Sequence, residues 1–196
     1  MTAVSNLDKV VAGLTGSGQT DFEIECGNLK NRIRTKLNQK LAELPKDVQE
    51  TLVANCILSG GAIASLYHNE EPKDYDLWSF FSTIIPLIQM KLQGVEDFST
   101  IDTGKNYSEM GVASFTSPNA VTLKNSIQFI TLGDYQSQRE KFDFVHCKPY
   151  YNLYAQKLFI SEEQWSCIKN KKLVISPGQS PSDIRISKFV GRGWRH

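Results

Sequence analysis

The sequence predicts an α/β (α+β) fold, with a mixed, mostly antiparallel sheet of roughly five strands and helices packed on one side. Two patterns lead to this prediction. Short apolar runs bounded by glycine or turn residues, such as NCILSG at residues 55–60, have the length of buried strands. Longer segments with leucine or isoleucine at every third or fourth position have the period of amphipathic helices. The 196 residues are enough for one compact domain.

The N-terminal part is predicted to be an arm followed by helices. Residues 1–20 are rich in glycine, serine and threonine, which favours a flexible arm, and residues 21–196 are expected to form a single domain. Apolar residues recur with a helical period over residues 28–44, until Pro45 ends the pattern. A short helix over residues 47–54 follows.

A strand, a glycine turn, a helix and a second strand come next. The strand at residues 55–60 is closed by Gly60 and Gly61. Residues 62–69 are predicted to be helical, and residues 74–81, DYDLWSFF, to form the second strand.

The C-terminal half is predicted to alternate helices with strands. Helices are expected at residues 84–95, 135–141, 162–170 and 182–190, and strands at 119–123, 126–133 and 142–147. Residues 98–112 are expected to be a polar loop. Ser161 and Gln164 have the spacing of a capping box, which marks the start of the third of these helices.

Composition limits the function less than the motifs do. The formal net charge of +1 neither requires nor excludes a nucleic-acid partner. The four cysteines form no CxxC pair, which is typical of the reduced thiols of a cytoplasmic protein. No run approaches the roughly 18 apolar residues of a membrane span, and the N-terminus does not resemble a secretory signal. We therefore expect a cytoplasmic protein without a membrane partner.

Three aspartates and a glycine pair are the candidate chemical groups. In an extended strand, Asp74 and Asp76 point to the same face, where two like charges need a cation or a shared proton. Asp143 lies in another strand-like run. Three carboxylates on neighbouring strands would form an oxygen cage for magnesium. Backbone NH groups at Gly60 and Gly61, free of side chains, could receive a phosphate at the start of a helix.

Each of these features also has an ordinary structural interpretation. A glycine pair is common at turns, and two aspartates one residue apart often lie on a solvated strand face. Near the C-terminus, Arg185, Lys188 and Arg192 are candidate contacts for a phosphate or an acceptor. The preferred explanation of these cations is a helix that packs its apolar side on the core and leaves its cations in water.

The joint pattern resembles a known family. Residues 59–78, SGGAIASLYHNEEPKDYDLW, are similar to the signature of the DNA polymerase beta-like nucleotidyltransferase superfamily, of the small phage-encoded type. That signature is an apolar residue, Gly, then Gly or Ser, a spacer, and two acids one residue apart between apolar residues. The resemblance is specific over residues 56–81 and weaker over residues 120–148, where Asp143 falls at the place of the family's third acid.

The resemblance implies a nucleotidyltransferase fold and roles for individual residues. The nucleotide triphosphate would be held by Ser59, Gly60 and Gly61. Two Mg²⁺ ions would be bound by Asp74 and Asp76, and Asp143 would bind one of them and deprotonate the acceptor. The implied activity is metal-dependent transfer of a nucleoside monophosphate from an NTP to a hydroxyl of an RNA end, a protein or a small molecule, in the host cytoplasm if the protein is phage-encoded.

The sequence also departs from parts of this superfamily. The Arg-Arg-Asp motif of tRNA-tailing members is missing, and no large RNA-binding or fingers domain fits in the chain. A template-directed polymerase is therefore not expected. The alternative function is a catalytically silent binding module with the same fold, such as a phage structural protein or an inhibitor of a host enzyme.

Overall fold

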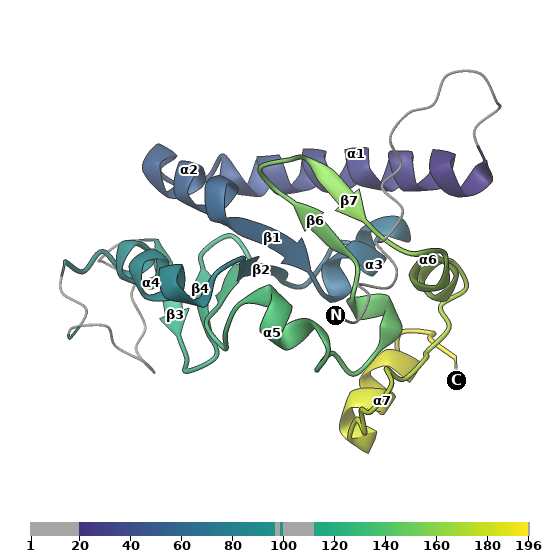
Figure 1. The fold of residues 1–196 in the computed structure, drawn as a ribbon. Coiled ribbons are helices and arrows are strands. Elements are labelled where there is room, and N and C mark those ends of the chain that lie inside the picture. Colours follow the sequence, from purple (N-terminus) through teal and green to yellow (C-terminus); the bar gives the residue numbers. More distant parts are fainter. Residues whose placement is uncertain (1–19, 97–98, 100–111, 196) are drawn as a thin grey trace, which may run out of the picture.

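The computed structural model describes residues 20–96, 99 and 112–195. Its centre is a seven-stranded sheet in the order β3-β4-β5-β2-β1-β6-β7, in which β2 and β5 are parallel and the other pairs are antiparallel. The predicted fold class, a mixed and mostly antiparallel sheet with helices, is confirmed (Figure 1). Among the described residues, no helix has the length and apolar character needed to cross a bilayer.

The bounds of the elements follow the chain order. The strands are β1 (Cys56–Ser59), β2 (Tyr75–Ser79), β3 (Ala113–Thr116), β4 (Ala120–Leu123), β5 (Ile127–Ile130), β6 (Tyr150–Asn152) and β7 (Lys157–Phe159). The α-helices are α1 (Asp21–Leu41), α2 (Lys46–Asn55), α3 (Gly61–Tyr67), α4 (Ile85–Gln93), α5 (Tyr135–Arg139), α6 (Glu162–Lys169) and α7 (Asp183–Val190). The described residues also include the 3₁₀ turns η1 (Ser82–Ile84) and η3 (Val145–Cys147).

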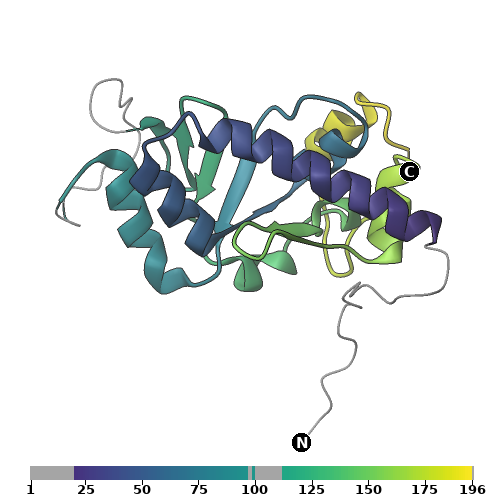
Figure 2. The ribbon, with the colours of Figure 1, turned by 90° about the horizontal axis from the view of Figure 1, so that it is seen from above.

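Helix α1 lies across one face of the sheet (Figure 2). It begins at Asp21, earlier than the predicted start at residue 28, because Thr20 and Glu23 form a capping box. Its buried residues Ile33 and Leu37 belong to one large apolar cluster with Leu58, Leu77 and other inward-facing strand residues. Burial of this stripe against the sheet holds the helix in place.

The opposite face of the sheet carries the polar residues of the predicted motif. Strand alternation places Tyr75 and Leu77 in the main core, and Asp76 and Trp78 on the other side. Asp76 is opposite Gln128 in the parallel pair of β2 and β5. Helix α7 lies on this side, away from α1 (Figure 1).

Three strands were not predicted. They are β3, β6 and β7, of which β6 and β7 contain three residues each, too few to show a clear alternation of apolar and polar side chains. β6 joins the sheet through β1, and β7 extends it as a hairpin partner of β6. The predicted count of roughly five strands was therefore too low.

One predicted strand was wrong. Residues 142–147 form a single bridge between Phe144 and Ile175 and then the turn η3. The alternating pattern arises because Phe142 packs with Trp78 on one side, while Phe144 is buried in the main core. The predicted arm, except Thr20, lies outside the described residues, and so does most of the predicted polar loop at 98–112.

A buried histidine attaches the C-terminal segment to the core. The ring of His146 is 3.8 Å from that of Trp194 and 4.8 Å from that of Phe189, measured between centroids. Burial, assisted by the charge of Arg192, lowers the pKa of His146 to about 3. The imidazole is therefore neutral where it packs against α7 and the residues after it.

We expect the acid stability of the protein to depend on His146. The unfolded state takes up this proton below the ordinary pKa of 6.5, whereas the folded state resists protonation down to about 3. His146 therefore contributes stability above pH 6.5 that is lost as the pH falls toward 3. In His146→Phe, the unfolding free energy from urea titrations should fall less steeply over this range. Equal slopes in the two proteins would contradict the prediction, and pH 7–8 is the control range.

Candidate functional site

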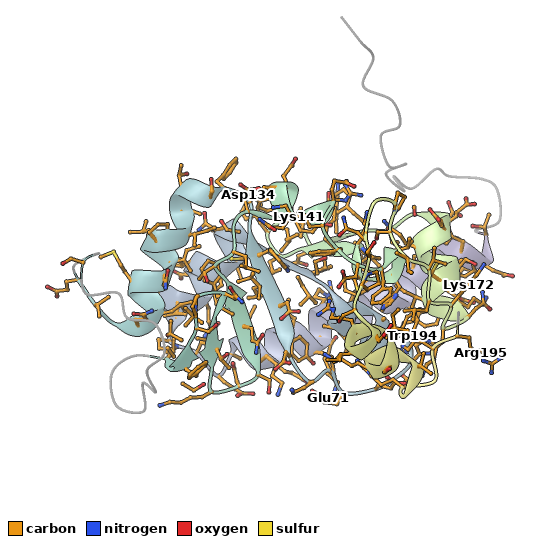
Figure 3. All side chains as sticks on the ribbon, turned by 90° about the horizontal axis from the view of Figure 1, so that it is seen from below. Glu71, Asp134, Lys141, Lys172, Trp194 and Arg195 are labelled. Carbon is orange, nitrogen blue, oxygen red and sulfur yellow. The ribbon has the colours of Figure 1, made fainter. Side chains whose placement is uncertain are left out.

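A cleft of about 500 Å³ lies on the sheet face opposite α1. It is bounded by β2, the start of α3, the segment from α5 to η3, and α7. Of the predicted site residues, those that line it are Gly60, Gly61, Asp74, Asp76, Asp143, Arg185, Lys188 and Arg192. Figure 3 views this side and labels Lys141, which lines the cleft, and Trp194, which follows α7 in the chain. Residues from distant parts of the sequence therefore meet at one place.

The glycine turn is shaped by its first residue. Gly60 has φ +91° and ψ −159°, a conformation that is almost restricted to glycine. A Cβ at this position would lie 3.0 Å from Oδ2 of Asp76. Gly60 thus allows the β1–α3 turn to pass close to the Asp76 carboxylate. At Gly61, by contrast, a Cβ would meet nothing within 4 Å.

Ser59 does not face the cleft. Its side chain is buried, and its hydroxyl donates to the carbonyl of Pro149 at 2.8 Å and lies 3.2 Å from that of Cys147. The same Cys147 carbonyl accepts a hydrogen bond from the backbone NH of Gly60. Ser59 therefore ties the turn to η3, and a nucleotide contact through its hydroxyl would require these bonds to break.

Asp74 and Asp76 form the predicted like-charged pair. Burial, and next the charge of Asp74, raises the pKa of Asp76 to about 6, although Lys188 and Arg185 oppose the shift. Gln128 donates a long hydrogen bond of 3.4 Å to Asp74. A hard cation would relieve this repulsion, so the pair suits a magnesium ion by charge and by donor type.

Asp143 lines the cleft but is paired with a cation. The Nε of Arg185 donates to its Oδ2 at 2.7 Å. Within the described ranges, no group of three or more His, Cys, Asp or Glu side chains is placed to hold a metal ion. The three-carboxylate cage stays a prediction, and it requires Asp143 to exchange Arg185 for the metal.

Cationic side chains outnumber acidic ones in the cleft wall. Its cations are Lys73, Lys141, Arg185, Lys188 and Arg192, and its acids are Asp74, Asp76 and Asp143. Lys73 and Lys141 were not predicted, although each lies within two residues of a predicted aspartate. This excess of positive charge favours an anionic ligand.

One end of the cleft is apolar. Trp78 and Phe142 have ring centroids 5.3 Å apart, and both line the cleft with Leu132, which is 53% exposed. Sequence reasoning missed these residues. Strand alternation could have identified Trp78, because it lies two residues after Asp76 and shares its face.

Comparisons with known proteins identify the family. The family described as Gabija anti-defense 2 matches residues 31–171, a span that contains the glycine turn and the three aspartates. The chain belongs to the Gabija anti-defense 2 family. A search of curated proteins found no match to this chain.

Two solved structures have a weak similarity to this Gabija anti-defense 2 protein. A Thermotoga maritima CCA-adding enzyme complexed with tRNA has a TM-score of 0.40 at 13% identity, over 70% of this chain and 35% of the enzyme. A CCA-adding enzyme in complex with CTP has a TM-score of 0.37 at 11% identity, over 71% of this chain and 35% of the enzyme. The chain thus spans about a third of the length of each.

The two glycines should respond differently to the same substitution. Gly60→Ala is expected to lower the free energy of unfolding by about 1–3 kcal/mol, because its backbone conformation is strained for any residue with a Cβ. Gly61→Ala should change it by less than about 0.5 kcal/mol, since the added methyl meets no neighbour. Urea titrations of both variants give the comparison. Equal losses would mean that the turn is not shaped as described.

Asp76→Asn should stabilise the metal-free protein at neutral pH. Because the pKa of Asp76 is raised from 3.8 to about 6 in the folded state, its protonation favours folding below pH 3.8, and this contribution is lost as the pH rises through about 6. The asparagine of the variant would carry no charge that folding must bury. The melting temperature of the variant should therefore rise above that of the parent as the pH increases from 3.8 to about 6, and should stay above it at higher pH. Melting temperatures in EDTA between pH 3.5 and 8 measure the effect. A variant that melts below the parent at pH 7.5 would assign Asp76 a structural role.

Proposed function

We propose that this protein is a nucleotidyltransferase that moves a nucleoside monophosphate from an NTP to a hydroxyl acceptor. The observation that carries the proposal is that the Gly60–Gly61 turn, the Asp74–Asp76 pair and the cations of α7 meet in one cleft. A phosphate-binding turn, paired carboxylates and an excess of positive charge are what a bound metal–triphosphate complex needs.

Residues of the cleft would have separate roles in binding the triphosphate and in activating the acceptor. The open space at Gly61 lets the triphosphate approach the backbone, and Lys188 and Arg192 offset its negative charge. Asp143, released from Arg185, would accept the proton of the acceptor hydroxyl. The acceptor oxygen then bonds to the α-phosphorus as the bond to the bridging oxygen breaks, and pyrophosphate leaves.

Magnesium fits the donor set of this cleft. Asp74 and Asp76 would hold two Mg²⁺ ions, and Asp143 would also bind one of the two. Carboxylate oxygens are the ligands that this metal prefers. Bound there, the ions would lower the pKa of the acceptor hydroxyl and stabilise the negative charge of the departing pyrophosphate.

The acceptor is an RNA end, a protein side chain or a small molecule. The family name, Gabija anti-defense 2, describes action against a defence and no reaction. We propose that nucleotide transfer serves that action, in the cytoplasm of a host infected by a phage that encodes the protein.

A catalytically silent binding module is the second candidate. The Arg185–Asp143 ion pair favours it, because a permanent pair would keep the third carboxylate from a metal and from an acceptor. Such a module would bind NTP in the same cleft, or inhibit a host protein, without transferring a nucleotide.

Labelled NTPs distinguish the two candidates. With Mg²⁺, each of the four α-³²P-labelled NTPs and a host extract containing RNA and protein, the parent should release pyrophosphate and label an acceptor. Asp74→Asn and Asp76→Asn should each reduce the rate by at least about a hundredfold, since metal stabilisation is worth several kcal/mol.

Asp134→Asn is the matched control. Asp134 accepts a hydrogen bond at the start of α5 and lies outside the cleft wall, and asparagine caps a helix equally well. This variant should keep the parent's rate. NTP binding by the parent without any labelled acceptor would favour the silent module. No NTP binding with Mg²⁺ would refute the transferase and the nucleotide-binding form of the module, and would leave inhibition of a host protein as the remaining candidate.

A further inference from the structure

We propose that α7 is a polyphosphate-binding element in which Arg185 exchanges the Asp143 carboxylate for a phosphate of the ligand. The ligand class is an inorganic or nucleoside polyphosphate, bound without a metal ion. The inference rests on the proposed function for the identity of its natural ligand, a nucleoside triphosphate. It adds that Asp143 becomes available as a base only after this ligand has bound Arg185.

Arg185 and Lys188 are placed to act together. They are three residues apart, so they lie on one face of α7, and both line the cleft. Within the described part of the chain, Lys188 forms no hydrogen bond or ion pair, and its charge acts on Asp76 across the cleft. Lys188 is therefore a cation that is available to a ligand.

Arg192 is held more firmly. Its Nη2 donates to the hydroxyl of Ser65 at 2.9 Å and lies 3.7 Å from the carboxylate of Glu70. Lys171 also contacts Glu70, at 2.7 Å. Arg192 thus gives the cleft a fixed positive charge, whereas Arg185 and Lys188 can change partners.

The side chain of Arg185 can change partners while the helix stays in place. Ile184 in the first turn of α7 is 83% exposed, whereas Ile186 and Phe189 pack on the main core and hold the backbone. The side chain of Arg185 is 54% exposed. Turning it toward a ligand therefore removes no apolar residue of α7 from the core.

The Arg185–Asp143 pair is weak enough to be exchanged. The side chain of Arg185 is 54% exposed and that of Asp143 is 24% exposed, so water reaches the pair from the arginine side and competes with the partner charge. An arginine binds phosphate through parallel charged hydrogen bonds, and a polyphosphate offers several oxygens to Arg185 and Lys188 together. A polyphosphate should therefore displace the carboxylate.

Because of this exchange, Asp143 can accept the proton of the acceptor hydroxyl only after the nucleotide has bound. In the ligand-free protein its carboxylate is neutralised by Arg185, and after the exchange it is free to accept a proton. Under the proposed function, the nucleotide would bind first and the acceptor would be activated afterwards.

Inorganic tripolyphosphate in EDTA at low salt tests the inference without metal or catalysis. Calorimetry of the parent should show binding, and Lys188→Ala and Arg185→Ala should each weaken it by about fivefold or more. Asp143→Asn should bind more tightly than the parent, because Arg185 is then already released. A metal-bridged site predicts the opposite sign for this variant.

A double variant separates the exchange from simple charge repulsion. Removing the Asp143 charge reduces repulsion in any background, but the release of Arg185 contributes only when Arg185 is present. The gain from Asp143→Asn should therefore shrink in the Arg185→Ala background. An equal gain in both backgrounds, or a weaker Asp143→Asn complex, would overturn the proposal.

Arg195→Ala is the matched control for lost positive charge. Arg195 is exposed and points away from the molecule (Figure 3), and it does not line the cleft. This variant should bind tripolyphosphate as the parent does, and a fivefold loss here would show that net charge alone explains the effect.

The result is separable from that of the transfer assay. A parent that transfers nucleotides but does not bind tripolyphosphate in EDTA refutes this inference alone. A parent that binds tripolyphosphate as described but transfers nothing supports the α7 element and refutes the proposed enzyme.

Discussion

The burial of Asp76 beside a second carboxylate, Asp74, is the constraint on which the rest of the cleft depends. Asp74, directly before β2, and Asp76 within it both line the cleft, and Asp76 is partly buried beside the Gly60 turn. Burial and like charge both disfavour ionisation, so the fold must bring positive charge to the site. Lys188 and Arg185 supply it, and both come from α7, far along the chain. The position of α7 therefore matters more to this site than its small buried surface suggests.

Aromatic packing in the core keeps α7 in place although most of its residues are exposed. The aromatic rings of His146, Phe189 and Trp194 join η3 to the end of α7. The same η3 turn accepts the backbone hydrogen bond from Gly60 and contacts the Ser59 hydroxyl through Cys147. One short turn thus connects the glycine loop with the cationic helix. Because Ile186 and Phe189 anchor α7, Arg185 and Lys188 can face the cleft and remain accessible to a ligand.

Much of the fold and part of the site were predictable because local patterns encode them. The helical period identified the main buried stripe of α1, and the Ser161–Gln164 capping box starts α6 as predicted. Period-two alternation placed Asp74 and Asp76 together on the face away from the main core. The segment around Asp143 was misassigned because its two phenylalanines alternate like those of a strand while they pack in different clusters. Very short strands such as β7 carry too few residues for any period to appear.

The sequence by itself determined the local elements around the motif, the special role of a glycine turn, and the shared face of two aspartates. Each of these follows from residues that are close in the chain, where backbone geometry sets the spacing. Only the tertiary structure decided that Asp143 pairs with Arg185 and that Ser59 is buried under the turn. It also decided that Lys73 and Lys141 line the same cleft. These contacts join segments far apart in sequence, and their geometry depends on how the packed core orients whole elements, which no local period records.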